Sequence, residues 1–174
     1  MYVNAIVVIV MIAAVIIDIR EHRIPNILSF FLVLFGLLYN LFDDVYMFVD
    51  SLKAVIGVFI IFLIPYNMGI LGAGDIKIMM GLASVYRLTS MWSIIMYILI
   101  AGTLFSAIHL LAKGRLKSSV KRIVGDLYQL IQTGQFTQFK IKNKTVNTDT
   151  ALPYSIAIAS GYAVFILKEI IGVS

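Results

Sequence analysis

Two carboxylates lie at the ends of long apolar runs, where charged side chains are rare. Asp18 ends the run AIVVIVMIAAVII, and Asp75 begins a later apolar segment. A carboxylate in a membrane costs about 2.5–3.5 kcal/mol at a helix centre and less toward the interface. When two carboxyl groups lie within hydrogen-bond reach, both cannot ionise cheaply, and one keeps its proton. Such a pair can hydrolyse a bond, because one group activates a water and the other donates a proton to the scissile carbonyl.

Each carboxylate, taken alone, also has a structural interpretation. Asp75 could cap the helix that it begins, since an Asp at an N-cap satisfies free N–H groups. Asp18 could pair with one of the basic residues near it in sequence or depth, namely Arg20, Arg23 and Lys77. These interpretations do not account for two carboxylates at one depth, nor for the glycines that precede Asp75.

The glycines and the missing residue types favour a pair of acids working without other catalytic groups. Gly72 and Gly74 precede Asp75 in GAGD. Glycine adopts backbone conformations closed to other residues and leaves room for an extended peptide to approach. The sequence has no cysteine and only two histidines, His22 and His109, far apart. We therefore expect aspartic-protease chemistry with no metal site and no cofactor.

The composition is that of a membrane protein. Of the 174 residues, 61% are hydrophobic and only 13% are charged, and the mean hydropathy is +0.99. Soluble domains are nearer half apolar, with about 25% charged residues. The sequence thus predicts an all-α, polytopic membrane protein. A net charge of +5 is explained below by membrane sidedness and attraction to anionic lipid, so no nucleic-acid partner is expected.

Six segments are apolar enough to be membrane helices, which need about 20 residues each. The fourth is short and could be a half-buried helix behind a re-entrant loop. A cytoplasmic loop, residues 113–150, separates the last two, and its apolar positions between 116 and 131 recur every three or four residues, as in an amphipathic surface helix. We expect one membrane-embedded domain, residues 1–174. The six segments are 2–19, 27–42, 52–68, 75–86, 90–112 and 152–171.

The basic residues define the sides of the membrane. With both termini outside, 11 of the 14 Lys and Arg residues fall on the inner side and 3 on the outer side, as the positive-inside rule requires. Asp18 and Asp75 then both lie at cytoplasmic helix ends, although 57 positions separate them in the sequence. The three outer residues are Lys53, Arg87 and Lys168.

Two motifs carry a resemblance to a known family. The stretch GAGDIK, residues 72–77, resembles the GxGD signature of membrane aspartyl proteases, and DIREHRIPN, residues 18–26, resembles the Asp, basic and Ile-Pro-Asn stretch of type IV prepilin peptidases. ALPYSIAIASG, residues 151–161, is faintly similar to the start of a late helix in that family. Six helices in about 170 residues are similar to the small stand-alone members, such as the tight-adherence (Flp-type) pilus and archaeal preflagellin enzymes.

The resemblance implies an activity and a place for it. Such enzymes sit in the prokaryotic plasma membrane and cut the leader from prepilin-like proteins at the cytoplasmic face, and Asp18 and Asp75 match their catalytic aspartates. Larger members also methylate the new N-terminus, with an added domain that often carries paired cysteines. This chain has neither, so we expect a peptidase without methyltransferase activity. The partners expected are a prepilin-like substrate and membrane lipid, and the oligomeric state stays open.

Around the two acids, five residues are candidates for shaping the loops or binding substrate. We expect Pro25 to start the second helix and Asn26 to bond loop backbone. Lys77 either tunes the acid pair or extends to the headgroups, as lysines at a membrane edge do. The full set of candidates is Gly72, Gly74, Lys77, Pro25 and Asn26.

Three alternatives remain at this point. The presenilin group shares GxGD but has more helices and a Pro-Ala-Leu motif, which ALP at 151–153 reverses. A small ion-coupled transporter or proton-relay subunit could use Asp18 and Asp75 for cations or protons, but such sites lie near the membrane midplane. A non-catalytic relative is disfavoured by the intact motif pair.

Overall fold

The fold consists of apolar helices. The computed structural model describes residues 2–21, 23–67, 71–112, 114, 124–125, 128 and 154–172, and its regular elements over those residues are helices. Each of the five contains a stretch long and apolar enough to cross a membrane. The prediction of an all-α, polytopic membrane protein is therefore confirmed. The helices are α1 (Tyr2–Glu21), α2 (Asn26–Asp43), α3 (Val45–Asn67), α4 (Ala73–Ala112) and α6 (Tyr154–Ile171).

The boundaries differ from the prediction in two places. The fourth and fifth predicted segments are joined in α4, which contains one non-helical residue, Arg87. The third segment begins at Val45 rather than near residue 52, because Asp44 caps it: Oδ1 of Asp44 accepts the N–H of Tyr46 at 2.9 Å, a stabilising arrangement at a helix start. The predicted amphipathic helix between 116 and 131 lies largely outside the described residues.

The chain divides into two compact units, residues 1–102 with 153–174, and residues 103–152. The first unit holds α1, α2, α3, most of α4 and α6, and it contains the candidate site. In the second unit, residues 103–112 complete α4, and the large apolar side chains described there are exposed, as expected of a lipid-facing helix. These exposed side chains are Leu104, Phe105, Ile108 and Leu111.

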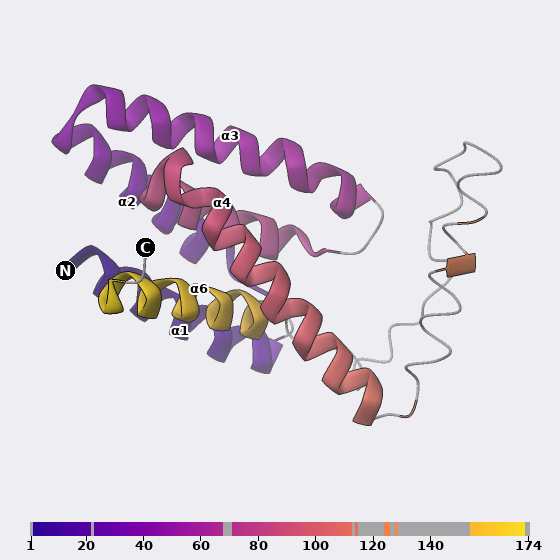
Figure 1. Ribbon diagram of the computed structural model, residues 1–174. Coiled ribbons are helices and arrows are strands. Elements are labelled where there is room, and N and C mark those ends of the chain that lie inside the picture. Colours follow the sequence, from indigo (N-terminus) through magenta and orange to yellow (C-terminus); the bar gives the residue numbers. More distant parts are fainter. Residues whose placement is uncertain are drawn as a thin grey trace. The chain divides into compact units, whose positions relative to one another are not determined.

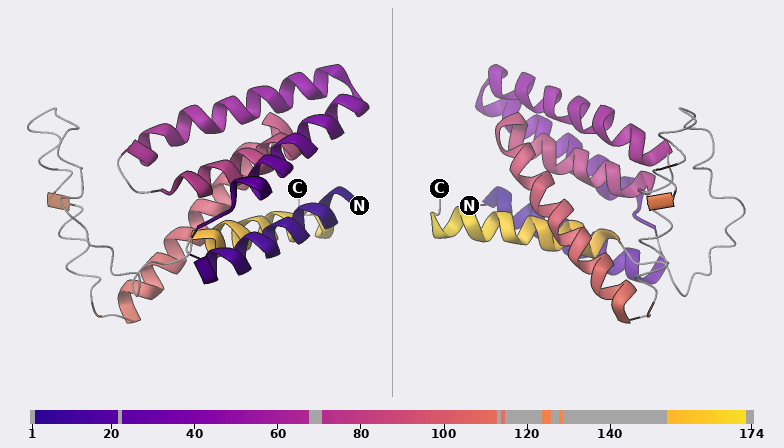
Figure 2. Two further views of the ribbon diagram at one scale, coloured as in Figure 1. Left: turned by 180° about the vertical axis from the view of Figure 1, so that it is seen from behind. Right: turned by 45° about the vertical axis from the view of Figure 1, so that its right-hand side comes forward.

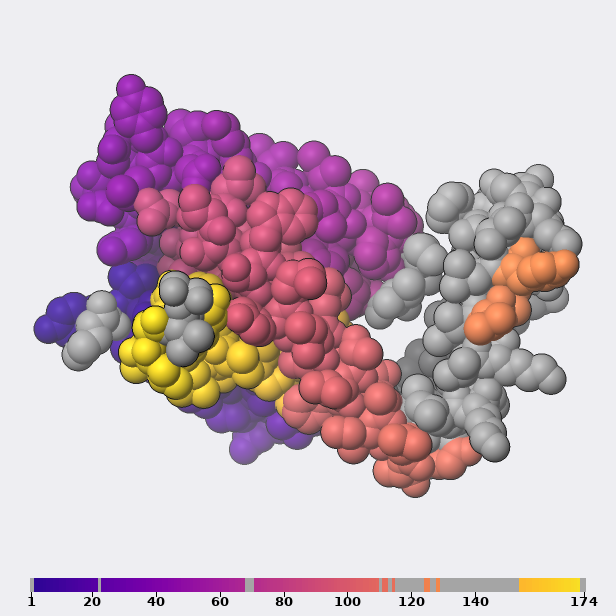
Figure 3. Space-filling model, viewed as in Figure 1, coloured from indigo at the N-terminus to yellow at the C-terminus, as the bar shows by residue number. Residues whose placement is uncertain are grey.

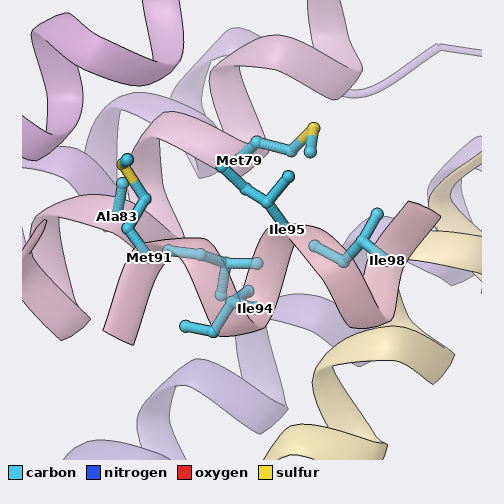
Figure 4. Close-up of a pocket in the computed structure, with 7 residues that line it drawn as sticks. Met79, Ala83, Met91, Ile94, Ile95 and Ile98 are labelled. Carbon is cyan, nitrogen blue, oxygen red and sulfur yellow. The ribbon is translucent and has the colours of Figure 1, made fainter. Parts of the chain in front are cut away.

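Arg87 turns α4 into a helical hairpin. Its φ of 62° and ψ of −178° are non-helical, so a first arm, residues 73–86, is followed by a second arm, residues 88–112. Figure 1 shows the ribbon of α4 reversing direction along its length. Met79 and Ala83 of the first arm face Met91, Ile95 and Ile98 of the second across a small apolar cavity (Figure 4). The prediction of two separate segments here was therefore correct in substance, with a single residue as the connection.

The break in α4 is stabilised from both sides by its neighbours. A helix end leaves its last carbonyls and first N–H groups without helical partners. The amide Nδ2 of Asn40, on α2, donates to the carbonyl oxygens of Ser84 at 3.0 Å and Val85 at 3.3 Å. On the other side of the break, the N–H of Leu88 donates to Oδ2 of Asp50, on α3, at 3.2 Å. The two neighbouring helices thus supply the hydrogen bonds that a reversal inside apolar surroundings needs.

Replacing Asn40 by leucine, which has nearly the same size, should lower the free energy of unfolding by about 1–3 kcal/mol. Asn40 is only 2% exposed, so its removal leaves buried carbonyls unpaired, and each costs desolvation energy. Unfolding in mixed detergent micelles would measure the change. Asn67→Leu, at the exposed end of α3, is the matched control. Equal stability of the two variants would contradict the role given to Asn40.

Small residues let the helices approach closely, as is usual in membranes. A Cβ at Gly36 of α2 would lie 2.6 Å from the backbone nitrogen of Val85, and one at Gly161 of α6 would lie 2.5 Å from Cα of Ile98. Figure 3 shows α6 lying against α4. Both views of Figure 2 place α1 and α6 side by side. Helices α1, α2 and α6 are therefore all held close to the hairpin or to one another.

The helices are fastened at two opposite ends. At one end, the hydroxyl of Tyr86 donates to Oδ1 of Asn4 at 2.9 Å and shares a hydrogen bond with the hydroxyl of Tyr162 at 2.6 Å. These contacts join the start of α1, the turn of α4 and the middle of α6. The ends of α1 and the starts of α2, α4 and α6 consequently meet at the other end, where the two predicted acids lie.

Candidate active site

Asp18 is a buried acid in the last turn of α1. Its side chain is 7% exposed, and Oδ2 accepts a hydrogen bond from the backbone N–H of Ser155 at 3.3 Å. Ser155 is the second residue of α6, so this N–H is one of the donors that a helix start leaves without a helical partner. In the described part of the chain, the partner of Asp18 is this amide rather than Arg20, Arg23 or Lys77.

Asp75 is the third residue of α4, and the glycine before that helix is bonded to it. Its Oδ2 accepts the N–H of Gly72 at 3.0 Å, and the carbonyl of Gly72 accepts the N–H of Ile76 at 3.4 Å. Gly72 is thus the N-cap, and Asp75 reaches back to it as the acid of a capping box does. A Cβ at Gly72 would lie 3.0 Å from that carboxyl oxygen, so a larger residue there would press on the Asp75 side chain.

The two acids share one end of the helix bundle. Asp18 and Asp75 are within electrostatic reach of one another, and Tyr154, the first residue of α6, is within reach of Asp75. Among the described residues, the hydrogen bonds to both carboxyls engage Oδ2. No residue in the described part of the chain donates a hydrogen bond to Oδ1 of either group. Two neighbouring carboxyls of this kind can share a proton and act as base and acid.

The two motif loops are joined by direct contacts. A Cβ at Gly74 would lie 3.1 Å from Cβ of Ile24, so the loop after α1 packs directly on the backbone that leads to Asp75. Nζ of Lys77 donates to Oδ1 of Asn26 at 2.8 Å. Pro25 immediately precedes α2, with a φ of −61° and a ψ of 134°, the extended backbone that ends a loop before a helix. Both loops thus form one surface around the acids.

Replacing Lys77 by methionine, or Asn26 by alanine, should lower the free energy of unfolding by up to about 1 kcal/mol, since the bond that joins them is exposed. The two losses should not add in the double variant, because both remove the same hydrogen bond. A double-mutant cycle of detergent unfolding checks this. Full additivity would mean that the two side chains act separately.

The structure brings together the predicted residues and adds others that the sequence did not single out. Gly72, Gly74, Lys77, Pro25 and Asn26 all lie in the two joined loops, beside Asp18 and Asp75. Asp75 does stabilise the start of α4, as the structural interpretation proposed. It does so from the third helical residue, by accepting the N–H of Gly72. The residues that sequence reasoning missed are Ile24, which packs on Gly74, and Tyr154 and Ser155 of α6. The sequence offered no signal for Ser155, because the group that bonds Asp18 is a backbone N–H, which every residue except proline carries.

In the described part of this region, the two acids are the groups best suited to acid–base hydrolysis. Among the described residues, no three His, Asp or Glu side chains gather in a way that could hold a metal ion. The chain has no cysteine, so thiolate ligands and thiol nucleophiles do not arise. What the site presents is two carboxyls, a glycine turn and a helix start.

Comparison with known proteins agrees with this arrangement. The sequence model of the type IV leader peptidase family matches residues 5–111, which include Asp18, Asp75 and both motif loops. No curated protein and no solved structure matches the chain. The match covers more than half of the 174 residues. The chain therefore belongs to the type IV leader peptidase family, and its class of activity is that of a membrane peptidase.

Proposed function

We propose that this protein is an aspartyl endopeptidase that removes the leader of prepilin-like substrates at the cytoplasmic face of the membrane. The observation that carries the proposal is the placement of Asp18, in the last turn of α1, and Asp75, in the first turn of α4, at one end of the bundle. Membership of the leader peptidase family supports the substrate class. The residue types around the pair support acid–base hydrolysis rather than a covalent intermediate.

The reaction needs one proton shared by the two carboxyls. The ionised carboxylate takes a proton from a water, whose oxygen attacks the scissile carbonyl carbon. The protonated carboxyl donates its proton to the carbonyl oxygen, which gives a neutral tetrahedral diol. As the C–N bond breaks, the leaving nitrogen takes a proton from the group that had accepted one, and the diol returns one to the other. The pair ends in its starting protonation state.

The charges support a cytoplasmic site. Arg20, Arg23 and Lys77 lie at the same end of the bundle as the two acids, close to them in α1, α4 and the loop between α1 and α2. Basic residues gather on the inner side of membrane proteins. The same charges face the anionic lipid of that leaflet. The proposal therefore includes a cytoplasmic site in a prokaryotic plasma membrane, with both ends of the chain on the outer side.

The proposal includes leader cleavage without methyl transfer. In the larger members of the family, methylation accompanies an added domain that often carries paired cysteines, and these 174 residues contain no cysteine. The product should therefore carry a free, unmethylated N-terminus when the methyl donor is present.

Reconstitution tests the proposal. Wild-type protein in liposomes, mixed with a prepilin-like substrate and a methyl donor, should release the leader and leave an unmodified N-terminus by mass spectrometry. Cleavage should survive EDTA, since two carboxyls suffice. If the protein cleaves nothing, the peptidase proposal is wrong; if it then moves ions across the liposomes, a transporter that uses the same aspartates replaces it.

A further inference from the structure

Helix α6 reaches the site although the family match does not include it. The match ends at residue 111, whereas α6 begins at Tyr154. The N–H of Ser155 nonetheless donates to Oδ2 of Asp18 at 3.3 Å. A contact between residues 137 positions apart connects the part of the chain that the family model matches to a part that it does not.

The position of this amide is fixed by the packing of α6. A Cβ at Gly161 would meet the backbone of Ile98 at 2.5 Å, so α6 lies directly on the second arm of α4. Near the site, a Cβ at Gly102 would lie 3.1 Å from the hydroxyl of Tyr154. Ser155 itself is 1% exposed. The amide therefore has little freedom to move away from Asp18.

The contact suits a carboxylate that must stay in one orientation. The first N–H groups of a helix point along its axis and carry partial positive charge, which favours an anion. The hydrogen bond to Oδ2 restrains rotation of the Asp18 carboxyl. Asp18 stands at the end of its own helix, where the carbonyls, not the N–H groups, are free, so α1 cannot supply such a donor.

We infer that α6 completes the active site, with Ser155 as a positioning residue whose backbone N–H orients Asp18 for catalysis. This inference rests on the proposed peptidase function. It assigns to α6 a contribution to kcat rather than to substrate binding, because the amide contacts the carboxylate that takes part in the reaction.

The role of the Ser155 backbone N–H can be tested separately from that of its side chain. Its hydroxyl is buried without a hydrogen-bond partner among the described residues, so Ser155→Ala removes no bond and keeps the amide. Ser155→Pro removes the N–H, and a proline in the first turn of a helix forfeits no helical hydrogen bond. Ile156→Pro places the same ring one residue later, where the lost N–H is not the one bonded to Asp18.

The test measures kcat and KM of the full-length protein in liposomes with a prepilin-like substrate. Ser155→Pro should lower kcat by about 10- to 100-fold, the value of a hydrogen bond to a charged group, with KM within about twofold. Ser155→Ala and Ile156→Pro should stay within about threefold of wild type, a margin for small packing changes. Equal kcat for the two proline variants, or an equal loss in Ser155→Ala, would overturn the inference.

A second chemical change covers the case in which Ser155→Pro does not fold. An α-hydroxy acid at position 155 replaces the amide by an ester and removes the same N–H with little steric change; its expected effect is the same fall in kcat. If Asp18→Asn still cleaves, the proposed function fails and the inference falls with it. If Asp18→Asn is inactive while the ester protein keeps wild-type kcat, only the inference fails.

Discussion

Asparagine in place of either Asp18 or Asp75 should lower kcat for leader cleavage by about 10⁴-fold, and the double variant should be no worse than the single ones. An amide can neither take a proton from water nor donate one as a carboxyl does. Groups that act as a unit lose most of their effect with the first member removed, so their effects do not add. Initial rates of leader release with saturating substrate provide the measurement.

The control for these variants is the same substitution at the opposite end of the bundle. Asp50→Asn removes a carboxylate but keeps an oxygen that can accept the N–H of Leu88, and it should cleave at the wild-type rate. Asn at position 18 likewise keeps an acceptor for Ser155, so the fold should persist. If either active-site variant retains more than a few per cent of wild-type kcat, the two carboxyls are not the catalytic pair.

Replacing Gly161 by alanine should destabilise the protein by about 3 kcal/mol and reduce cleavage with it. The added methyl would lie 2.5 Å from Cα and 2.6 Å from N of Ile98, and these are backbone atoms that cannot rotate aside. Overpacking of this kind costs about 1–3 kcal/mol, and more where nothing can yield. Because α6 carries Ser155, a helix pushed off α4 also loosens the contact to Asp18. Detergent unfolding and kcat would be measured together.

Gly57→Ala gives the matched comparison within α3. A Cβ there would meet one atom, Cε of Met91, at an ordinary 3.9 Å. Removing a helical glycine without a clash stabilises a helix by up to about 1 kcal/mol. This variant should therefore equal or exceed wild type in stability. Similar destabilisation of both variants would show that glycine itself, and not the close approach at Gly161, matters.

The sequence predicted the fold class and the two acids for a physical reason. A membrane helix must be apolar over its whole length, so each segment is visible as a run, and an unexplained carboxylate stands out against it. Sorting the basic residues then gave Asp18 and Asp75 the same side. The short fourth segment was also visible, although its direct continuation through Arg87 into the fifth was not.

The contacts that complete the site could not be predicted from the sequence. Ser155 and Asn40 act through a backbone N–H and a side-chain amide toward partners far away in the chain, Asp18 and the carbonyls of Ser84 and Val85. No local pattern encodes such a partner. The close approach at Gly161 depends in the same way on which face of α6 meets α4. The sequence of a weakly amphipathic apolar helix does not reveal which of its faces packs against a neighbour.

The short first arm of α4 also bears on the surrounding lipid. Residues 73–86 extend about 21 Å at a rise of 1.5 Å per residue, whereas the hydrocarbon core is about 30 Å thick. The bond between Lys77 and Asn26 holds the start of this arm level with the start of α2, so the shortfall falls at the Arg87 end. Hydrophobic mismatch of this kind is relieved by thinning of the bilayer. Most side chains of this arm are buried, however, among them Ile78, Leu82 and Val85. Protein rather than lipid therefore covers the missing length, and the arm can be shorter than the hydrocarbon core without thinning the bilayer around it.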